Sequence, residues 1–291
     1  MRRGWRVRGR EIALDRPLIL GIVNVTPDSF SDGGRFLSAD AALAHAERLV
    51  AEGADGLDVG GESTRPQGAS EVDAKEERER VLPVVRALRR RFPDTAISLD
   101  TVKADVAAAA LDEGADVVND VSGFRLDPRM GEICARGRCG VILMHSRGSV
   151  SEMGTYAHAD YGEDVTGTVV AELRGSADAA QRAGVAGDAV VLDPGLGFAK
   201  RSAHSLRVLA ELPRLAALGF PVMVGASRKR FIGELTGVTE PAMRVQGTVG
   251  ASVAALMRGA RLFRVHDFRP HREALDVAWA VLSAGAREGT P

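Results

Sequence analysis

Polar side chains recur in this sequence at the points where short apolar runs end. The residues at these positions are Asn24, Asp58, Asp100, Asn119, Asp120, His145, Asp193, Ser227, Lys229, Arg264 and His266. Carboxylates and amides bind the hydrogen-bonding edge of a heterocycle, whereas arginine, lysine and histidine bind anions. One Asp or Asn after a strand is more often a helix cap or a turn former than a ligand. Their recurrence at nearly every run end, however, indicates a shared site.

Two long polar loops follow the first two of these runs. The first reads NVTPDSFSDGG over residues 24–34, and the second reads GGESTRPQG over residues 60–68. Each has a simple explanation as a polar loop that caps the next helix. The length of the first loop and its aromatic Phe30 favour a mobile lid instead. The second loop has the same character and carries Arg65, which we expect to reach over the site.

A third motif, DPGLGFAK, covers residues 193–200. It resembles a glycine-rich phosphate loop, but it lacks the third glycine of a dinucleotide-binding fingerprint. A carboxylate followed by a tight turn and an aromatic residue fits a planar heterocycle better. Asp193 would accept hydrogen bonds from ring N–H groups, and Phe198 would pack nearby.

Cationic residues follow the last two apolar runs. The motif GASRK covers residues 225–229, and RVHD covers residues 264–267. If the fold is a (β/α)₈ barrel, these positions lie on its usual phosphate-binding side. Arg264 and His266 alternate along a strand end, so both are expected on one side, where they can donate hydrogen bonds to a diphosphate. The alternative is that either cation simply pairs with a carboxylate.

Eight short apolar runs, each ending in a polar or glycine residue, are predicted to be strands. They are Leu18–Asn24, Gly56–Gly60, Ala96–Asp100, Asp116–Asp120, Gly140–His145, Ala189–Asp193, Pro221–Gly225 and Arg261–His266. The segments between them have helical periodicity or composition. Clear examples are 39–53, the charged segment 74–91, in which Pro83 predicts a kink or a new turn, and the alanine-rich 102–111.

Nearly continuous apolar strands that alternate with helices predict a parallel sheet covered by helices. The phrases AEGADGLDVG and DEGADVVNDV repeat one βα unit, and no composition break or linker divides the chain. We therefore predict an α/β protein with a single (β/α)₈ TIM barrel over residues 17–291. Residues 1–16 are expected to be an N-terminal extension that forms a hairpin at the barrel bottom. The alternative is an open doubly wound sheet.

Composition narrows the class of protein. The chain has 291 residues, 45% hydrophobic and 26% charged, with a formal net charge of -1, so neither nucleic acid nor an anionic membrane is an expected partner. No apolar run is long enough for a transmembrane helix, and the basic N-terminus lacks a signal-peptide cleavage pattern. Cys134 and Cys139 form no disulfide framework, which predicts free thiols and a cytoplasmic location.

Eight motifs in order make the chain similar to dihydropteroate synthase, a family of folate biosynthesis. These are GIVNVTPDSFSDGG, DVGGESTRP, SLDT, VNDVSG, LMH, DPGLGFAK, GASRK and RVHD, within residues 18–282. The resemblance implies a transferase that condenses 6-hydroxymethyl-7,8-dihydropterin diphosphate with p-aminobenzoate, giving 7,8-dihydropteroate and diphosphate. It also implies a Mg²⁺ cofactor and p-aminobenzoate-like sulfonamides as inhibitors.

Site residues follow from the resemblance, motif by motif. The pterin would be bound by Asp100, Asn119, Met144, Asp193, Phe198 and Lys229. The diphosphate would be bound by Asn24, Arg264 and His266, with Asn24 also a Mg²⁺ ligand. The p-aminobenzoate site would contain Phe30, Ser31, Thr64, Arg65, Pro66 and Ser227. The catalytic residues would be Asp32, Lys229, Arg264 and His266.

Two features depart from the family's pattern. Gln67 is an extra residue in the second loop, and the segment after His145 is divergent, so no role is assigned there. Two other functions remain open: a methyltetrahydrofolate-binding barrel of a corrinoid methyltransferase, and a non-catalytic pterin-binding paralogue. The family also implies a homodimer, and the predicted last helices, 238–258 and 269–282, carry enough apolar residues for an interface or for barrel cover.

Overall fold

Eight parallel strands form the centre of the structure, a computed structural model that describes residues 4–25, 34–62 and 72–287. The strands are β3 (Leu18–Asn24), β4 (Gly56–Gly60), β5 (Ala96–Asp100), β6 (Val117–Asp120), β7 (Gly140–Met144), β8 (Val190–Asp193), β9 (Met223–Val224) and β10 (Leu262–Val265). Their order is β8-β7-β6-β5-β4-β3-β10-β9. A parallel bridge between Leu192 and Val222 joins the two outer strands. The sheet therefore closes into the predicted (β/α)₈ barrel, and the open doubly wound sheet is excluded.

The predicted strands agree with the observed ones closely, except near Pro221. The strand β9 has only two residues, whereas a run over residues 221–225 was predicted. Proline has no N–H to donate to a neighbouring strand, so a regular ladder cannot extend through Pro221. Its carbonyl still contributes to closure, because Leu192 N donates to Pro221 O at 3.0 Å.

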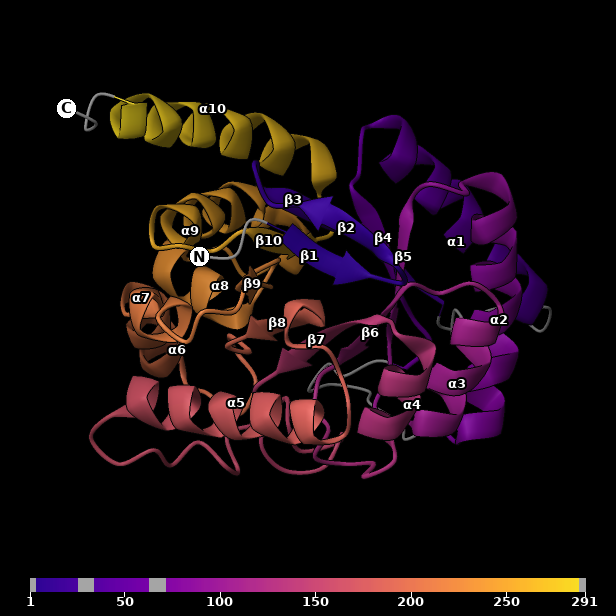
Figure 1. The fold of residues 1–291 in the computed structure, drawn as a ribbon. Helices are drawn as coiled ribbons and strands as arrows, with labels where there is room; N and C mark the ends of the chain where they lie inside the picture. The colour runs from indigo at the N-terminus through magenta and orange to yellow at the C-terminus, as the bar shows by residue number, and fades with distance from the viewer. Residues whose placement is uncertain (1–3, 26–33, 63–71, 288–291) are drawn as a thin grey trace.

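Helices surround the barrel on its outside (Figure 1). They are α1 (Gly34–Ala51), α2 (Ala74–Arg91), α3 (Ala104–Asp112), α4 (Met130–Gly137), α5 (Val165–Arg182), α6 (Ser202–Ala210), α7 (Leu212–Ala216), α8 (Arg230–Thr236), α9 (Val245–Met257) and α10 (Phe268–Arg287). Two 3₁₀ turns, Gly187–Ala189 and Pro241–Met243, accompany them. Over the described part of the chain, none of the helices has the length and apolar character needed to span a membrane.

The structure bears on two helix predictions. A kink or a new turn was predicted at Pro83; α2 continues through this proline from the Asp73 N-cap, whose side chain accepts a hydrogen bond from Glu76 N, so no new element begins there. The helix predicted over residues 238–258 begins only at Val245. The segment before it contains a 3₁₀ turn at Pro241, and the Arg244 guanidinium donates to Val238 O at 2.9 Å. These side-chain and backbone bonds hold a compact turn in place of the first helical turns.

A hairpin lies across the N-terminal end of the barrel, in the position expected for residues 1–16. It consists of β1 (Gly4–Val7) and β2 (Arg10–Ala13), which pair antiparallel. Trp5 is fully buried and its Nε1 donates to Ala189 O at 2.8 Å. Figure 1 shows the hairpin, in indigo, in front of the barrel strands. Trp5, the first aromatic residue of the sequence, therefore closes one end of the barrel.

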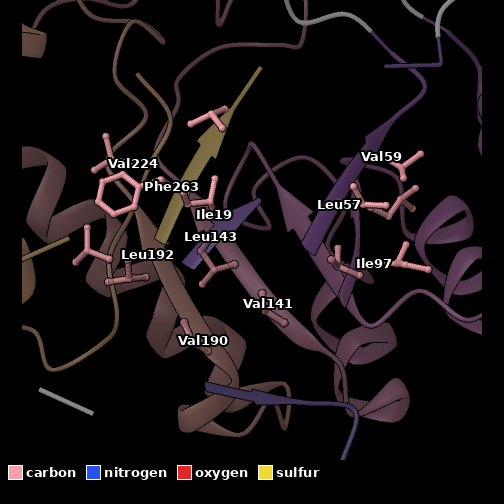
Figure 2. Close-up of a cluster of buried hydrophobic side chains, with 14 of the residues drawn as sticks. Ile19, Leu57, Val59, Ile97, Val141, Leu143, Val190, Leu192, Val224 and Phe263 are labelled. Atoms are coloured by element: carbon pink, nitrogen blue, oxygen red, sulfur yellow. The ribbon is translucent and has the colours of Figure 1, made fainter. Parts of the chain in front are cut away.

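Alternation along each strand divides the core in two. Outward-facing residues such as Leu57, Val141 and Phe263 pack against the helices, and Figure 2 shows this cluster. A second cluster, which includes Leu20, Ile142 and Trp5, groups residues of alternate strand positions with the hairpin. Because side chains alternate along a strand, these residues face the barrel interior near its N-terminal end. The same alternation places polar residues in the interior further along the strands.

Candidate active site

Asp58 is the centre of a polar network inside the barrel. It lies on β4 and is fully buried. Ser98 Oγ donates to Asp58 Oδ1 at 2.5 Å, and Asn119 Nδ2 donates to Asp58 Oδ2 at 3.2 Å. Arg264 Nε donates to Asp58 Oδ2 at 2.5 Å. Residues from three other strands thus meet on the Asp58 carboxylate. The sequence indicated Asp58 as a strand-end residue but did not assign it a role.

Arg264 bridges two carboxylates in this network. Its Nη2 donates to Asp100 Oδ2 at 2.7 Å, while its Nε binds Asp58. Burial raises the pKa of Asp100 to about 7, and the positive charge of Arg264 opposes that shift. Burial would lower the pKa of Arg264, but the two carboxylates hold it above its usual value. Arg264 therefore pairs with carboxylates, as the alternative allowed, and these two ion pairs fix its guanidinium beside β4 and β5.

Asn119 presents an unused hydrogen-bond acceptor. The residue is 2% exposed, and its Nδ2 is held by Asp58. Its Oδ1 is buried and has no hydrogen-bond partner among the described residues. A buried carbonyl oxygen without a partner costs about 1–3 kcal/mol, so such an atom in a native site indicates a missing donor. A ligand N–H group is the donor that this position fits.

Asp193 lies at the end of β8, in register with Met144 of β7. Its Oδ1 accepts from Gly195 N at 2.7 Å. Burial raises the pKa of Asp193 to about 6, against the effect of that N–H and of the charges on Lys229 and Arg264. Gly195 has φ +63°, and a Cβ there would lie 2.0 Å from His145 O, so the turn requires glycine. The tight turn at Gly195 thus allows its N–H to approach the Asp193 carboxylate closely.

An apolar wall adjoins these polar groups. Met144 belongs to a small buried cluster with Val102, Val121 and Met153, and Phe198 packs against it. Lys229 Nζ lies 3.7 Å from the centroid of the Phe198 ring. Asp193 is in register with Met144 of this wall, and a carboxylate that adjoins an apolar wall with an aromatic ring suits a planar heterocycle with N–H groups. The structure brings together the predicted residues Met144, Phe198 and Lys229.

Ser227 and His266 join the ends of the seventh and eighth strands of the barrel. Ser227 Oγ accepts from His266 N at 3.1 Å, and it lies 2.9 Å from His266 Nδ1. Beside them, Arg228 binds Asp267 through two hydrogen bonds. Arg228 is therefore a structural cation. The pair Ser227 and His266 lies at the C-terminal end of the barrel, which we call the mouth, on the side predicted to bind anions.

Other predicted site residues fall at the edge of the described structure or beyond it. Asn24 ends β3 and is exposed. The residues Phe30, Ser31, Asp32, Thr64, Arg65, Pro66 and Gln67 lie outside the described residues. The base of the second loop is described: Val72 N donates to Glu62 Oε1 at 2.8 Å, and Lys103 Nζ joins Glu62 to Glu77. Glu62 thus ties together the two sides of that loop.

Two strand-end residues have structural partners instead of facing a ligand. Asp120 accepts hydrogen bonds from Ser122 N, Ser122 Oγ and Phe124 N, so it shapes its own turn. His145 is buried between Lys200 and Glu172. No group of three or more His, Cys, Asp or Glu side chains suited to a metal occurs within residues 4–25, 34–62 and 72–287.

Comparisons with known proteins agree with this geometry. A family model described as pterin binding enzyme matches residues 20–266. A dihydropteroate synthase of Mycobacterium leprae is 46% identical over 272 residues, covering 92% of this chain and 94% of its own length. The Xanthomonas albilineans dihydropteroate synthase with 4-aminobenzoic acid has a TM-score of 0.88 and 44% identity, with 100% of both chains covered. The same enzyme in complex with 7,8-dihydropteroate has a TM-score of 0.85 and 42% identity, covering 99% and 100%.

The fold and the mouth define a (β/α)₈-barrel enzyme whose interior carboxylates and aromatic wall suit a planar, N–H-bearing heterocycle. The chain belongs to the pterin-binding enzyme family, among the dihydropteroate synthases.

Proposed function

We propose that this chain condenses 6-hydroxymethyl-7,8-dihydropterin diphosphate with p-aminobenzoate, releasing 7,8-dihydropteroate and diphosphate. It is a transferase of folate biosynthesis. One structural observation carries the proposal. The buried carboxylate of Asp193 is in register with Met144 of the apolar wall that includes Phe198, and the unused buried acceptor Asn119 Oδ1 is on the neighbouring strand β6. Family membership supports it, because relatives named dihydropteroate synthase match nearly the whole chain.

The pterin ring fits this side of the mouth by its hydrogen-bonding pattern. Its guanidine-like edge consists of N–H donors, which Asp193 and Asn119 Oδ1 would accept. The ring face would lie against Met144 and Phe198, and Lys229 would donate to the ring. The buried position of Asp193 strengthens each of these bonds, because water does not compete there.

The reaction requires stabilisation of a leaving group more than activation of a nucleophile. The lone pair of the p-aminobenzoate amine forms a C–N bond to the methylene carbon, the C–O bond to diphosphate breaks, and the amine proton passes to solvent. An arylamine is already neutral at pH 7, so no strong base is required. Negative charge that develops on the diphosphate would be stabilised by Arg264 and His266. Arg264 is held in place for this task by Asp58 and Asp100.

Mg²⁺ is part of the proposal. Asn24 offers an exposed amide oxygen at the end of β3. Mg²⁺ commonly keeps several waters and is bound through one or two protein oxygens together with substrate phosphates, so one amide oxygen fits this mode of binding. When bound, Mg²⁺ would supply positive charge next to the leaving diphosphate. Asn24 would orient it, and Asp32 would stabilise positive charge on the carbon.

The second substrate, p-aminobenzoate, would bind between Ser227 and residues of the two loops. Ser227 is 8% exposed and lies beside His266. The remaining proposed contacts, Phe30, Ser31, Thr64, Arg65 and Pro66, would close over it and exclude water. Sulfonamides resemble p-aminobenzoate in size and polarity, so they are expected to compete at this site.

A coupled diphosphate assay tests the proposal. We expect diphosphate release only when dihydropterin diphosphate, p-aminobenzoate and Mg²⁺ are all present, with a sulfonamide raising the KM for p-aminobenzoate. Folded protein that binds a pterin but releases no diphosphate would identify a non-catalytic paralogue. Methyl transfer from methyltetrahydrofolate to cob(I)alamin would instead identify the corrinoid methyltransferase class. Either result would contradict the synthase.

We also propose that the protein is a cytoplasmic homodimer assembled through α9 and α10, which pack against each other. Large apolar side chains on these helices are exposed: Met257 at 51%, Val277 at 67% and Val281 at 63%. Figure 1 shows α10 along one edge of the molecule beside α9. Exposed apolar residues grouped on one edge favour association. The buried, free thiols of Cys134 and Cys139 are consistent with a reducing compartment.

A further inference from the structure

A buried lysine lies directly behind the proposed pterin site. Lys200 is 1% exposed and is among the largest fully buried side chains of the described structure. Burial lowers its pKa to about 7, while the carboxylates of Asp193 and Glu172 oppose the shift. Placing an ammonium group in the interior is costly unless every hydrogen finds an acceptor. Interactions that offset the cost of burying Lys200 are therefore expected around its ammonium group.

Three acceptors lie within 3.2 Å of the ammonium nitrogen. Lys200 Nζ lies 2.7 Å from His145 Nδ1, 3.1 Å from Phe198 O and 3.2 Å from Gly195 O, and a fourth acceptor, His145 O, is more distant at 3.5 Å. An ammonium group has three hydrogens and no acceptor, so the three nearer partners match it in number. Two of the three are carbonyl oxygens of the turn that follows Asp193. The lysine thus binds the backbone of the site from behind.

His145 is held as a neutral acceptor. Burial and then the charge of Lys200 lower the pKa of His145 to about 4. With Nδ1 facing Lys200, the proton of the neutral ring lies on Nε2, which donates to Glu172 Oε2 at 2.8 Å. Arg147 also binds Glu172. The contacts therefore run from Lys200 through His145 to Glu172, a partly exposed residue of α5. Arg147 holds the Glu172 carboxylate in place.

The turn held by Lys200 carries the aromatic wall. Phe198 N donates to Gly195 O at 3.0 Å, and Ala199 N donates to Met153 O at 2.7 Å. Ala199 has φ +45°, a left-handed conformation that residues other than glycine rarely adopt, so the turn needs support at this position. The Phe198 ring contacts Lys229 at 3.7 Å. A shift of the turn would displace Phe198 and, through it, Lys229.

We infer that Lys200 is a positioning residue of the pterin site: its three hydrogen bonds to His145, Gly195 and Phe198 fix the turn that carries the aromatic wall. The inference rests on the proposed function, since it names what the turn is held for. Lys200 itself does not face the substrate. Its effect on pterin binding passes through the placement of Phe198 and Lys229, the groups that line the ring.

The variant Lys200→Met tests this role, because methionine has a similar length and cannot donate a hydrogen bond. We expect the affinity for 6-hydroxymethylpterin, measured by calorimetry, to fall about tenfold or more, since displacements near 1 Å in a site have effects of this order. The KM for dihydropterin diphosphate should rise by a similar factor. At saturating pterin substrate, kcat and the KM for p-aminobenzoate should change far less.

Arg89→Met is a matched control at the opposite end of the barrel. Arg89 also holds carbonyl oxygens with a cation: its Nε donates to Gly114 O at 3.0 Å and its Nη1 to Pro93 O at 2.6 Å. These carbonyls precede β6 and β5, away from the mouth. We expect Arg89→Met to lower the free energy of unfolding while leaving the pterin affinity unchanged. Equal affinity loss in both variants at equal stability would overturn the positioning role.

Amide hydrogen exchange gives a readout that needs no substrate. In Lys200→Met, the amides of Phe198 and Ala199 should exchange faster than in the wild type, while those of β3 and β4 should not. Wild-type protein that binds no pterin would contradict the proposed function. Wild-type protein that binds pterin, together with a folded Lys200→Met variant that binds it equally well, would contradict only the inference on Lys200.

Discussion

At the scale of single residues, the carboxylates of the mouth are buried at a cost to stability. The pKa of Asp193 is about 6 in the folded protein, raised by burial above its ordinary value of 3.8. The folded state therefore binds more protons than the unfolded state between these two pH values. The stability contributed by the protonated form is present below pH 3.8 and is lost as the pH rises through about 6. Near pH 7 the protein retains a charged acceptor that opposes folding.

The variant Asp193→Asn should reveal this cost. A shift of about two units corresponds to about 3 kcal/mol, so the stability of the variant relative to the wild type should rise by up to that amount from pH 4 to pH 7. Urea unfolding at several pH values measures the difference. At pH 7 the variant should also lose pterin affinity, because an amide offers a donor where the ring needs an acceptor. A pH-independent difference in stability would contradict the raised pKa.

At the scale of elements, the two ends of the barrel have separate tasks. Polar residues at the C-terminal strand ends form the site, whereas the hairpin β1–β2 covers the N-terminal ends with Trp5 and Val7. In barrels of this type the bottom contributes stability and the top contributes function. Changes in the hairpin should therefore affect folding without affecting ligand binding.

Trp5→Ala tests this separation. Trp5 is fully buried and donates a hydrogen bond to Ala189 O. Removing a buried tryptophan costs about 3–5 kcal/mol, and we expect a loss of this size in urea unfolding. Pterin affinity of the folded fraction should stay within about twofold of the wild type, because Trp5 lies at the end of the barrel opposite the site and its removal should leave the site geometry unchanged. A large loss of affinity at full folding would show that the two ends are coupled.

Elements with a continuous apolar pattern could be predicted from the sequence alone. The bounds of β3, β4 and β5 agree with the predicted runs, because strands buried on both faces are apolar along their length. Elements shaped by proline and by distant side chains could not. The strand β9 is short beside Pro221, and α9 begins late because Arg244 binds the carbonyl of Val238. No local pattern records those contacts.

At the scale of the whole molecule, the exposed apolar residues of α10 determine the expected assembly. The double variant Val277→Glu and Val281→Glu should convert a dimer to a monomer in sedimentation velocity, because charges buried at an interface without partners are strongly unfavourable. Leu126→Glu, at an exposed apolar residue outside α9 and α10, is the control and should leave the dimer intact. Wild-type protein that sediments as a monomer would contradict the proposed interface.

The sequence by itself determined the barrel, its order of strands and the ring of polar strand ends, because periodicity and residue type are local properties. It also placed Asp193, Asn119, Met144, Phe198 and Lys229 in the motifs that meet at the mouth. The partners of these residues were decided by tertiary structure.

Only the pairing of β10 with β3, strands that lie at opposite ends of the chain, brings Arg264 of β10 to Asp58 of β4 and Asp100 of β5. Likewise, only the packing of the turn after β8 against β7 buries Lys200 beside His145. The sequence shows that a residue at a strand end is polar, but it does not show how far that residue lies from other polar groups. A hydrogen bond forms only when the donor–acceptor distance is about 2.7–3.2 Å. Which carboxylate a cation binds therefore depends on distances between strands that are far apart in the chain.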